Sequence, residues 1–184
     1  MRCLTRMSLA ALLCAALAPI ASAATDAHPV GIDAMTATVM QEGQSSFSGI
    51  GLRMRIASPS FIEGIEFMPT VEYWRNANSV QPFGISTRRK DATLGVDVRY
   101  SFRSTGLKPY AGAGYGLHFL SSAVDAPSLG INNQSNALIK GGLSAMGGAS
   151  FALAGRFDNF VELKYHHVPS YRQLKLNWGI AMKL

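Results

Sequence analysis

The chain alternates apolar and polar residues with a period of two, the pattern of a β-strand whose two faces meet different surroundings. The clearest example is LGVDVRYSF, residues 94–102, in which apolar side chains hold every second position. Asp97 and Arg99 lie on the opposite face from them. The pattern leaves two interpretations: the apolar face packs into a protein core, or it faces lipid while the charges point inward.

Period-two alternation recurs in eight segments, with no helical periodicity between them. The predicted strands cover residues 32–40, 48–57, 64–74, 94–102, 108–120, 137–154, 159–168 and 173–184. The first is the least distinct, because neither of its faces is clearly apolar. Short turns at 58–60, 103–107 and 155–159 alternate with long connections at 75–89 and 121–136. Short turns at one end and longer loops at the other are typical of a transmembrane β-barrel.

Several features favour lipid over a soluble β-sandwich, which would also alternate. Many predicted strands approach or exceed the ~9–11 residues needed to cross a bilayer, whereas an average strand has ~5–6. The polar faces combine glycines with charges of both signs, which suits a narrow barrel interior. Pro69 lies within an apolar face, and the chain ends on a strand. We therefore predict an all-β fold, an eight-stranded antiparallel up-and-down transmembrane β-barrel with both termini in the periplasm.

Residues 1–23 predict a cleaved secretory signal peptide. Arg2 and Arg6 precede an apolar run that is too short to span a bilayer, and the segment ends in the small-x-small pattern Ala21-Ser22-Ala23. Both cysteines lie in this segment, so the exported chain would contain none. Residues 24–184 are predicted to form a single barrel domain. Charge and composition are compatible with either fold and exclude neither.

If the apolar faces meet lipid, the charged residues of the strands lie inside the barrel. They are the basic residues Arg53, Arg55, Arg99, Lys140, Lys164, Lys175 and Lys183 and the acidic residues Glu66, Glu72, Asp97 and Glu162. Eight strands enclose a space that side chains just fill, and unpaired buried charges are costly. We therefore expect a plug of ion pairs and water, with a small pore as the alternative.

The chain resembles the small outer-membrane β-barrels of Gram-negative bacteria, the OmpA and OmpX kind. The resemblance is carried by the signal peptide, by LKPYAGAGYGLHF after a short turn, by GRFDNFVELKYHH as hairpin and strand, and by the terminal LKLNWGIAMKL. It implies an outer-membrane location, contact with outer-membrane lipids and assembly by the barrel assembly machinery. Members usually end in an aromatic residue that this machinery reads, and Leu184 departs from that pattern. We expect a monomer.

Motifs for a cofactor or a metal are weak. The sequence GAGYGL lacks the third glycine and the following helix of a dinucleotide site. His166 and His167 are adjacent on a predicted strand, so they point to opposite faces and cannot share a metal ion. We predict no cofactor, no metal and no enzymatic activity.

The layout is also similar to that of the outer-membrane lipid A deacylases, eight-stranded barrels with a lipid-facing Ser-His-acid site, which implies an enzymatic alternative. In that family, a histidine near the end of the seventh strand is followed two residues later by the nucleophilic serine. Here Val168 or Pro169 holds that position, which leaves His167 and Ser170 as the only catalytic candidates. No Asp or Glu follows Ser170, although a triad needs a third group to orient its base.

Arg88, Arg89 and Lys90 form a basic cluster at the outer end of a long predicted loop. Arginine donates paired hydrogen bonds to phosphate, which makes the cluster the candidate contact with lipopolysaccharide; a solvated loop is the simpler alternative. Aromatic partners for nucleic acid are lacking, and the compartment is wrong for it. The predicted function is therefore non-enzymatic: envelope integrity, or loop-mediated interaction with lipopolysaccharide, a host surface or another protein.

Overall fold

A computed structural model describes residues 26–58, 62–80, 84–129, 131–169 and 171–184. The predicted signal peptide and Ser170 lie outside these residues. Within them, no helix has the length and apolar character needed to cross a membrane.

Eight strands form a closed antiparallel barrel, which confirms the predicted fold class. Each strand pairs with its neighbours in sequence, and β8 closes the sheet by pairing with β1. The elements are β1 (His28–Gln41), β2 (Phe47–Ala57), β3 (Ile65–Val80), β4 (Ile85–Ser101), β5 (Leu107–Ala126), the short 3-10 helix η1 (Pro127–Leu129), β6 (Ile131–Ala154), β7 (Phe157–Val168) and β8 (Tyr171–Lys183).

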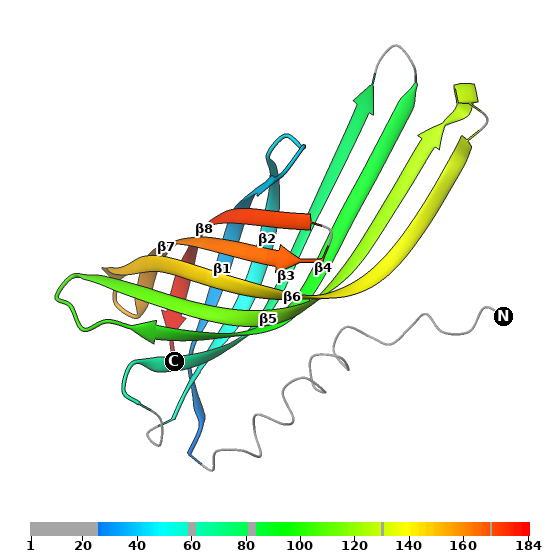
Figure 1. Cartoon of the computed structure of the whole chain (residues 1–184). Coiled ribbons are helices and arrows are strands. Elements are labelled where there is room, and N and C mark those ends of the chain that lie inside the picture. The colour runs from blue at the N-terminus through cyan, green and yellow to red at the C-terminus, as the bar shows by residue number, and fades with distance from the viewer. Residues whose placement is uncertain (1–25, 59–61, 81–83, 130, 170) are drawn as a thin grey trace.

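The barrel has two unlike ends. Figure 1 shows the β3–β4 and β5–β6 hairpins projecting from one end, called here the hairpin end, while the C-terminus lies at the opposite, terminal end. At the terminal end, β6 and β7 are joined by Gly155 and Arg156 alone. Gly155 has a φ of +55°, which glycine adopts without steric cost and which two-residue hairpins favour. A tight two-residue turn therefore joins β6 to β7 at the terminal end.

The inner and outer faces of the barrel have opposite chemistry. Large apolar side chains such as Leu52, Leu176 and Ile180 are exposed on the outside, whereas most buried side chains are charged or polar, with a few large apolar ones such as Met68 and Phe160 between them. The interior is crowded: a Cβ added at Gly114 would lie 2.0 Å from Oδ1 of Asp97. An apolar exterior around a packed polar interior is the arrangement of a small transmembrane barrel.

The prediction of long connections at residues 75–89 and 121–136 is wrong. β3 and β4 continue through the first segment and β5 and β6 through the second, so only residues 81–84 and 127–130 separate the strands. The alternation failed as a signal because both faces of these segments are largely polar, as in a sheet with water on both sides. We call this extension the projecting wall and define it as residues 75–80, 85–90, 121–126 and 131–137.

The wall rises on one side of the barrel mouth only. β2 stops pairing with β3 at Gly49 and Trp74, and β7 stops pairing with β6 at His167 and Leu143. The mouth is therefore bounded by the wall on one side and by the shorter β1–β2 and β7–β8 hairpins on the other.

Candidate functional site

Charged side chains inside the barrel pair across strands, and one group lies toward the terminal end. Arg53 Nε donates to Asp33 Oδ2 at 3.1 Å, and its Nη1 donates to Glu162 Oε2 at 2.9 Å. Arg55 Nε donates to Oδ1 of Asp33 at 2.9 Å. The Tyr110 hydroxyl also donates to Glu162, at 3.1 Å. All five residues are buried, and the pairing offsets the cost of removing their charges from water.

Glu66 and Arg99 belong to the same group. Glu66 pairs with Arg99 and lies 3.6 Å from Nη1 of Arg55. The Arg99 guanidinium lies over the Tyr110 ring, 4.6 Å from its centroid, a cation–π contact. Arg53, Arg55 and Arg99 therefore each have an acidic partner, and Arg99 also packs on an aromatic ring.

A second group lies at mid-barrel around Lys164. Its Nζ donates to Glu72 Oε1 at 2.9 Å and to Asp97 Oδ2 at 2.7 Å. Lys175 pairs with Glu72 as well, and Ser144 Oγ donates to Asp97 Oδ1 at 3.0 Å. Because β7 stands opposite β3 in the closed strand order, the Lys164–Glu72 pair crosses the lumen. Side chains occupy the lumen at this level.

A third buried cluster lies between these ion pairs and the hairpin end. His118 Nδ1 is 2.8 Å from Asp91 Oδ2 and 3.0 Å from Thr93 Oγ1. The Tyr171 hydroxyl donates to Asp91 Oδ2 at 3.1 Å. The ring of His166 packs edge-to-face against that of His118, with centroids 5.4 Å apart. The cluster thereby holds Tyr171 in place at the base of the mouth.

Above this cluster, the barrel opens into two cavities of about 520 and 330 Å³, called here the mouth cavities. Gln41, Arg89 and Tyr171 line both. The larger is otherwise lined by polar side chains including Glu42, Gln44, Asn76, Asn78, Thr87 and Arg172. Trp74, Leu120 and Leu138 add apolar surface to the smaller one.

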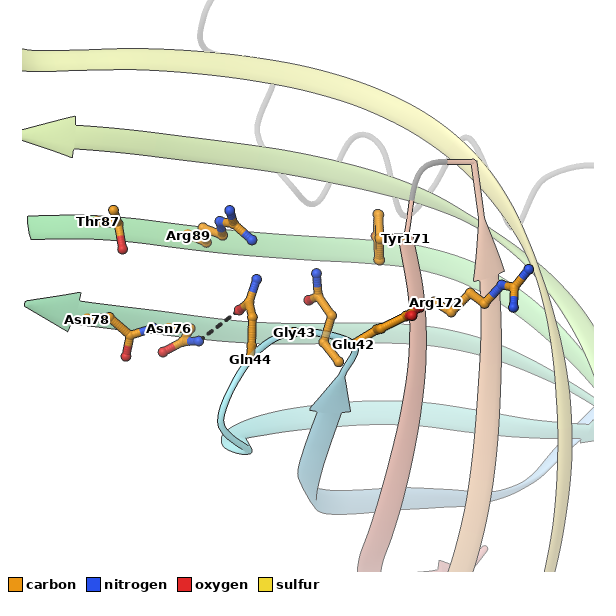
Figure 2. Close-up of a pocket in the computed structure, with 10 residues that line it drawn as sticks. Glu42, Gly43, Gln44, Asn76, Asn78, Thr87, Arg89, Tyr171 and Arg172 are labelled. Carbon is orange, nitrogen blue, oxygen red and sulfur yellow. Dashed lines mark hydrogen bonds between the residues drawn. The ribbon is translucent and has the colours of Figure 1, made fainter.

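Figure 2 shows that the lining of the larger cavity comes from three parts of the fold. Asn76, Asn78, Thr87 and Arg89 lie on β3 and β4, Glu42 and Gln44 on the β1–β2 turn, and Tyr171 and Arg172 on β8. The Nδ2 of Asn76 donates to Oε1 of Gln44 at 3.0 Å and links the wall to the opposite turn. The site therefore combines hydrogen-bonding groups from separate elements with the inward-facing Arg89.

The outer face of β3–β6 changes character where the wall begins, between two neighbouring rows of cross-strand partners. The row nearer the barrel is apolar and consists of Tyr73, Ala92, Phe119 and Ile139. The next row toward the hairpin end consists of Arg75, Lys90, Ser121 and Ala137. Lipid contact by the first row and water or headgroup contact by the second follow from this change.

The basic cluster predicted on a loop instead lies on strand β4, and its members are divided between faces. Arg88 and Lys90 are on the outer face, where Arg75 is the cross-strand partner of Lys90. Arg89 is on the inner face and lines both mouth cavities. The structure thus replaces one loop cluster by an outer group of Arg75, Arg88 and Lys90 and an inward Arg89. Sequence reasoning missed Arg75, because its nearness to Lys90 depends on the hairpin register.

Two lysines predicted inside the barrel lie at its ends. Lys140 lines the smaller mouth cavity, and its Nζ donates to the backbone oxygen of Pro169 at 2.8 Å. Lys183, near the terminal end, donates to Asp158 at 2.7 Å while its side chain stays 42% exposed. Both are therefore only partly withdrawn from solvent.

The deacylase candidates are not brought together with an acid. His167 is exposed on the outer face, and its cross-strand partners are Leu143 and Arg172. Ser170 lies outside the described residues. Neither strand beside His167 places a carboxylate at its register position.

The fold and its chemistry define a class: a closed eight-stranded barrel with an apolar exterior and an ion-paired lumen is the architecture of small outer-membrane proteins. Solved structures agree. Neisserial surface protein A is 25% identical, with 86% of this chain and 99% of that chain covered and a TM-score of 0.54. Ail of Yersinia pestis, solved in complex with the heparin analogue sucrose octasulfate, is 13% identical over 86% and 99%, with a TM-score of 0.58.

A major outer-membrane protein from Thermus thermophilus is 13% identical, covers 85% of this chain and 100% of its own, and has a TM-score of 0.65. A scan against protein-family models and a search of the curated proteins gave no match. The chain thus has the fold of the small outer-membrane β-barrels that the sequence resemblance pointed to, and these neighbours imply an outer-membrane location.

Proposed function

We propose that this chain is a non-enzymatic outer-membrane barrel that contributes to the cell surface by binding lipopolysaccharide through the outer face of its projecting wall. The observation that carries the proposal is the outer group of Arg75, Arg88 and Lys90. These cations begin one row beyond the apolar surface, the level at which lipid phosphates are found. None of the three has a carboxylate partner among the described residues. Their charges are therefore available to phosphate oxygens.

The test compares refolding into vesicles with and without lipopolysaccharide. Ligand that binds only the folded barrel raises its free energy of unfolding by mass action. The triple variant Arg75→Gln, Arg88→Gln and Lys90→Gln should lose most of that increase while keeping the stability of the unsubstituted chain in plain lipid.

The matched control removes three exposed basic residues at the terminal end: Arg103→Gln, Lys108→Gln and Arg156→Gln. It should retain the full lipopolysaccharide-dependent increase. Equal losses in the two triple variants would mean that net charge, rather than the wall, carries the effect, and would refute the proposal.

The proposal includes two further expectations from the sequence. Residues 1–23 act as a cleaved export signal, so the mass of the purified protein should correspond to a chain that starts at Ala24. The lumen-crossing pairs Arg53–Glu162 and Lys164–Glu72 support a plugged barrel. Planar bilayers containing the protein should therefore show no steady nanosiemens-scale openings.

A further inference from the structure

The larger mouth cavity is lined by groups suited to a polyhydroxylated ligand. Gln44, Asn76 and Asn78 each carry an amide that both donates and accepts hydrogen bonds, and the Thr87 hydroxyl does the same. Neighbouring hydroxyls of a sugar ring also donate and accept. At about 520 Å³, the cavity falls in the range of ~300–1,000 Å³ that small-molecule sites occupy.

Arg89 places a cation inside the barrel mouth. It enters both cavities from the inner face of β4 and is not ion-paired in the part of the chain that the structure describes. Arg172 also borders the larger cavity, but it is the cross-strand partner of the outward-facing His167, and its side chain points away from Arg89 in Figure 2. Glu42 is the acidic residue in the same lining. A guanidinium binds a carboxylate through two parallel hydrogen bonds, so Arg89 can hold an acidic group while the amides contact hydroxyls.

The base of the site is held rigidly and contains an unsatisfied donor. Tyr171 is fixed by Asp91, which is fixed in turn by His118. Trp74 lines the smaller cavity and is only 3% exposed, yet its indole Nε1 has no hydrogen-bond partner within the described part of the chain. Buried indole N–H groups normally find an acceptor.

We infer that the mouth cavities form a binding site for an acidic saccharide, with Arg89 holding its carboxylate and the surrounding amides its hydroxyls. This site goes beyond the proposed lipopolysaccharide contact, because it lies on the inner face of the wall and uses Arg89 rather than Arg88. Two sources share the required chemistry: acidic sugars in the core of lipopolysaccharide, and a soluble or capsular polysaccharide.

The experiment uses Trp74 as its reporter. The chain has two tryptophans, and Trp178 is exposed on the lipid-facing side. The variant Trp178→Phe therefore leaves Trp74 alone to report on the cavity. In detergent free of lipopolysaccharide, a short oligomer of glucuronic acid should change its fluorescence saturably. A glucose oligomer of equal length and acetate should both bind at least tenfold more weakly.

Adjacent residues on opposite faces provide the matched control. Arg89→Gln should weaken binding of the glucuronate oligomer about tenfold, the loss expected for one charge-assisted pair. Arg88→Gln should leave it unchanged. Calorimetric titration of the unsubstituted chain provides a readout independent of fluorescence. Absence of both heat and fluorescence change, equal binding of the glucose oligomer, or equal weakening by Arg88→Gln and Arg89→Gln would each overturn the inference.

Competition then identifies the source. If lipopolysaccharide with a complete core displaces the glucuronate oligomer in an Arg89-dependent manner and core-truncated lipopolysaccharide does not, the sugar comes from the same membrane. If neither competes, the site serves a soluble or capsular polysaccharide. Lys90 borders the smaller cavity, whereas Arg75 and Arg88 line neither. The double variant Arg75→Gln and Arg88→Gln should therefore not affect either result, so the two proposals fail independently.

Discussion

Strand β4 passes through two surroundings, and its charges behave differently in each. In the closed barrel, Asp91, Asp97 and Arg99 are buried, and each is held by side chains from other strands. In the projecting wall, Arg88 and Arg89 are exposed and have no ion-pair partner among the described residues. The same strand therefore carries charges that stabilise the fold at one end and charges that are free to bind a ligand at the other.

The difference follows from what surrounds each part. Lipid fixes the outer face of the closed barrel as apolar, so its charges must point into a narrow lumen and neutralise one another. The wall has no such apolar face, and a charge that meets water or lipid headgroups there needs no partner within the protein. We expect substitutions in the lumen to affect stability and substitutions in the wall and mouth to affect binding.

The strongest test of this contrast removes Glu72, which holds both Lys164 and Lys175. Glu72→Gln leaves two buried ammonium groups with reduced compensation and should cost about 3–5 kcal/mol in the free energy of unfolding. Urea titration of the protein in lipid vesicles, followed by heat-modifiable migration on gels, measures the change. The matched variant Glu42→Gln, at the mouth, should change stability by about 0.5 kcal/mol or less. Equal costs would abolish the distinction between the two regions.

A slightly smaller effect is expected from a charge placed on the outer face. Leu176 lies near the middle of β8 and is 45% exposed. Leu176→Arg should reduce the stability of the folded barrel in lipid by about 2–4 kcal/mol. Ala77→Arg, on the outer face of the wall, should cost almost nothing in the same titration. If Ala77→Arg is equally harmful, the membrane boundary between the Tyr73 and Arg75 rows is misplaced.

The boundary explains which elements the sequence could predict. Inside the membrane, the outer face must be apolar at every second position, and the segment 94–102 shows this without knowledge of any contact. In the wall, the hydrogen-bond ladder continues but no apolar face is required, so residues 75–89 carry no strand signal. Backbone hydrogen bonding between strands does not by itself require any pattern of side-chain polarity, so such a pattern cannot reveal it.

The buried network was predictable only in part, for a related reason. Lys164, Glu72 and Asp97 follow from strand alternation once the inner face is known. Asp33 was missed because Met35 and Val39 also face inward and make neither face of β1 distinctly polar. The Asp91–His118 pair joins residues on neighbouring strands, and only the β4–β5 register brings them together. Predicting which residues pair therefore requires the strand register, whereas predicting which face of the strand a residue lies on does not.

Crowding in the lumen should be measurable as a further, smaller cost. A Cβ at Gly114 would meet Asp97 Oδ1 at 2.0 Å and the Val96 carbonyl oxygen at 2.8 Å. Gly114→Ala should therefore destabilise the barrel by about 1–3 kcal/mol. Gly147 faces outward, where the nearest atom to an added Cβ is 4.0 Å away, so Gly147→Ala is the control and should be close to neutral. If the two glycines tolerate alanine equally in urea titration, the lumen is less tightly filled than the ion pairs indicate.

For the lipid-facing side of the β7–β8 hairpin, we expect substitutions to have no effect on lipid A. His167 is exposed there between Leu143 and Arg172, with no carboxylate at either neighbouring register position. A base without a group to orient it and stabilise its charge is a poor partner for a serine nucleophile. Mass spectra of lipid A from cells with and without the protein should therefore be identical, and His167→Ala should change neither the spectra nor lipopolysaccharide binding. Loss of an acyl chain that depends on both the protein and His167 would establish the deacylase alternative and place the function on the closed barrel instead of the wall.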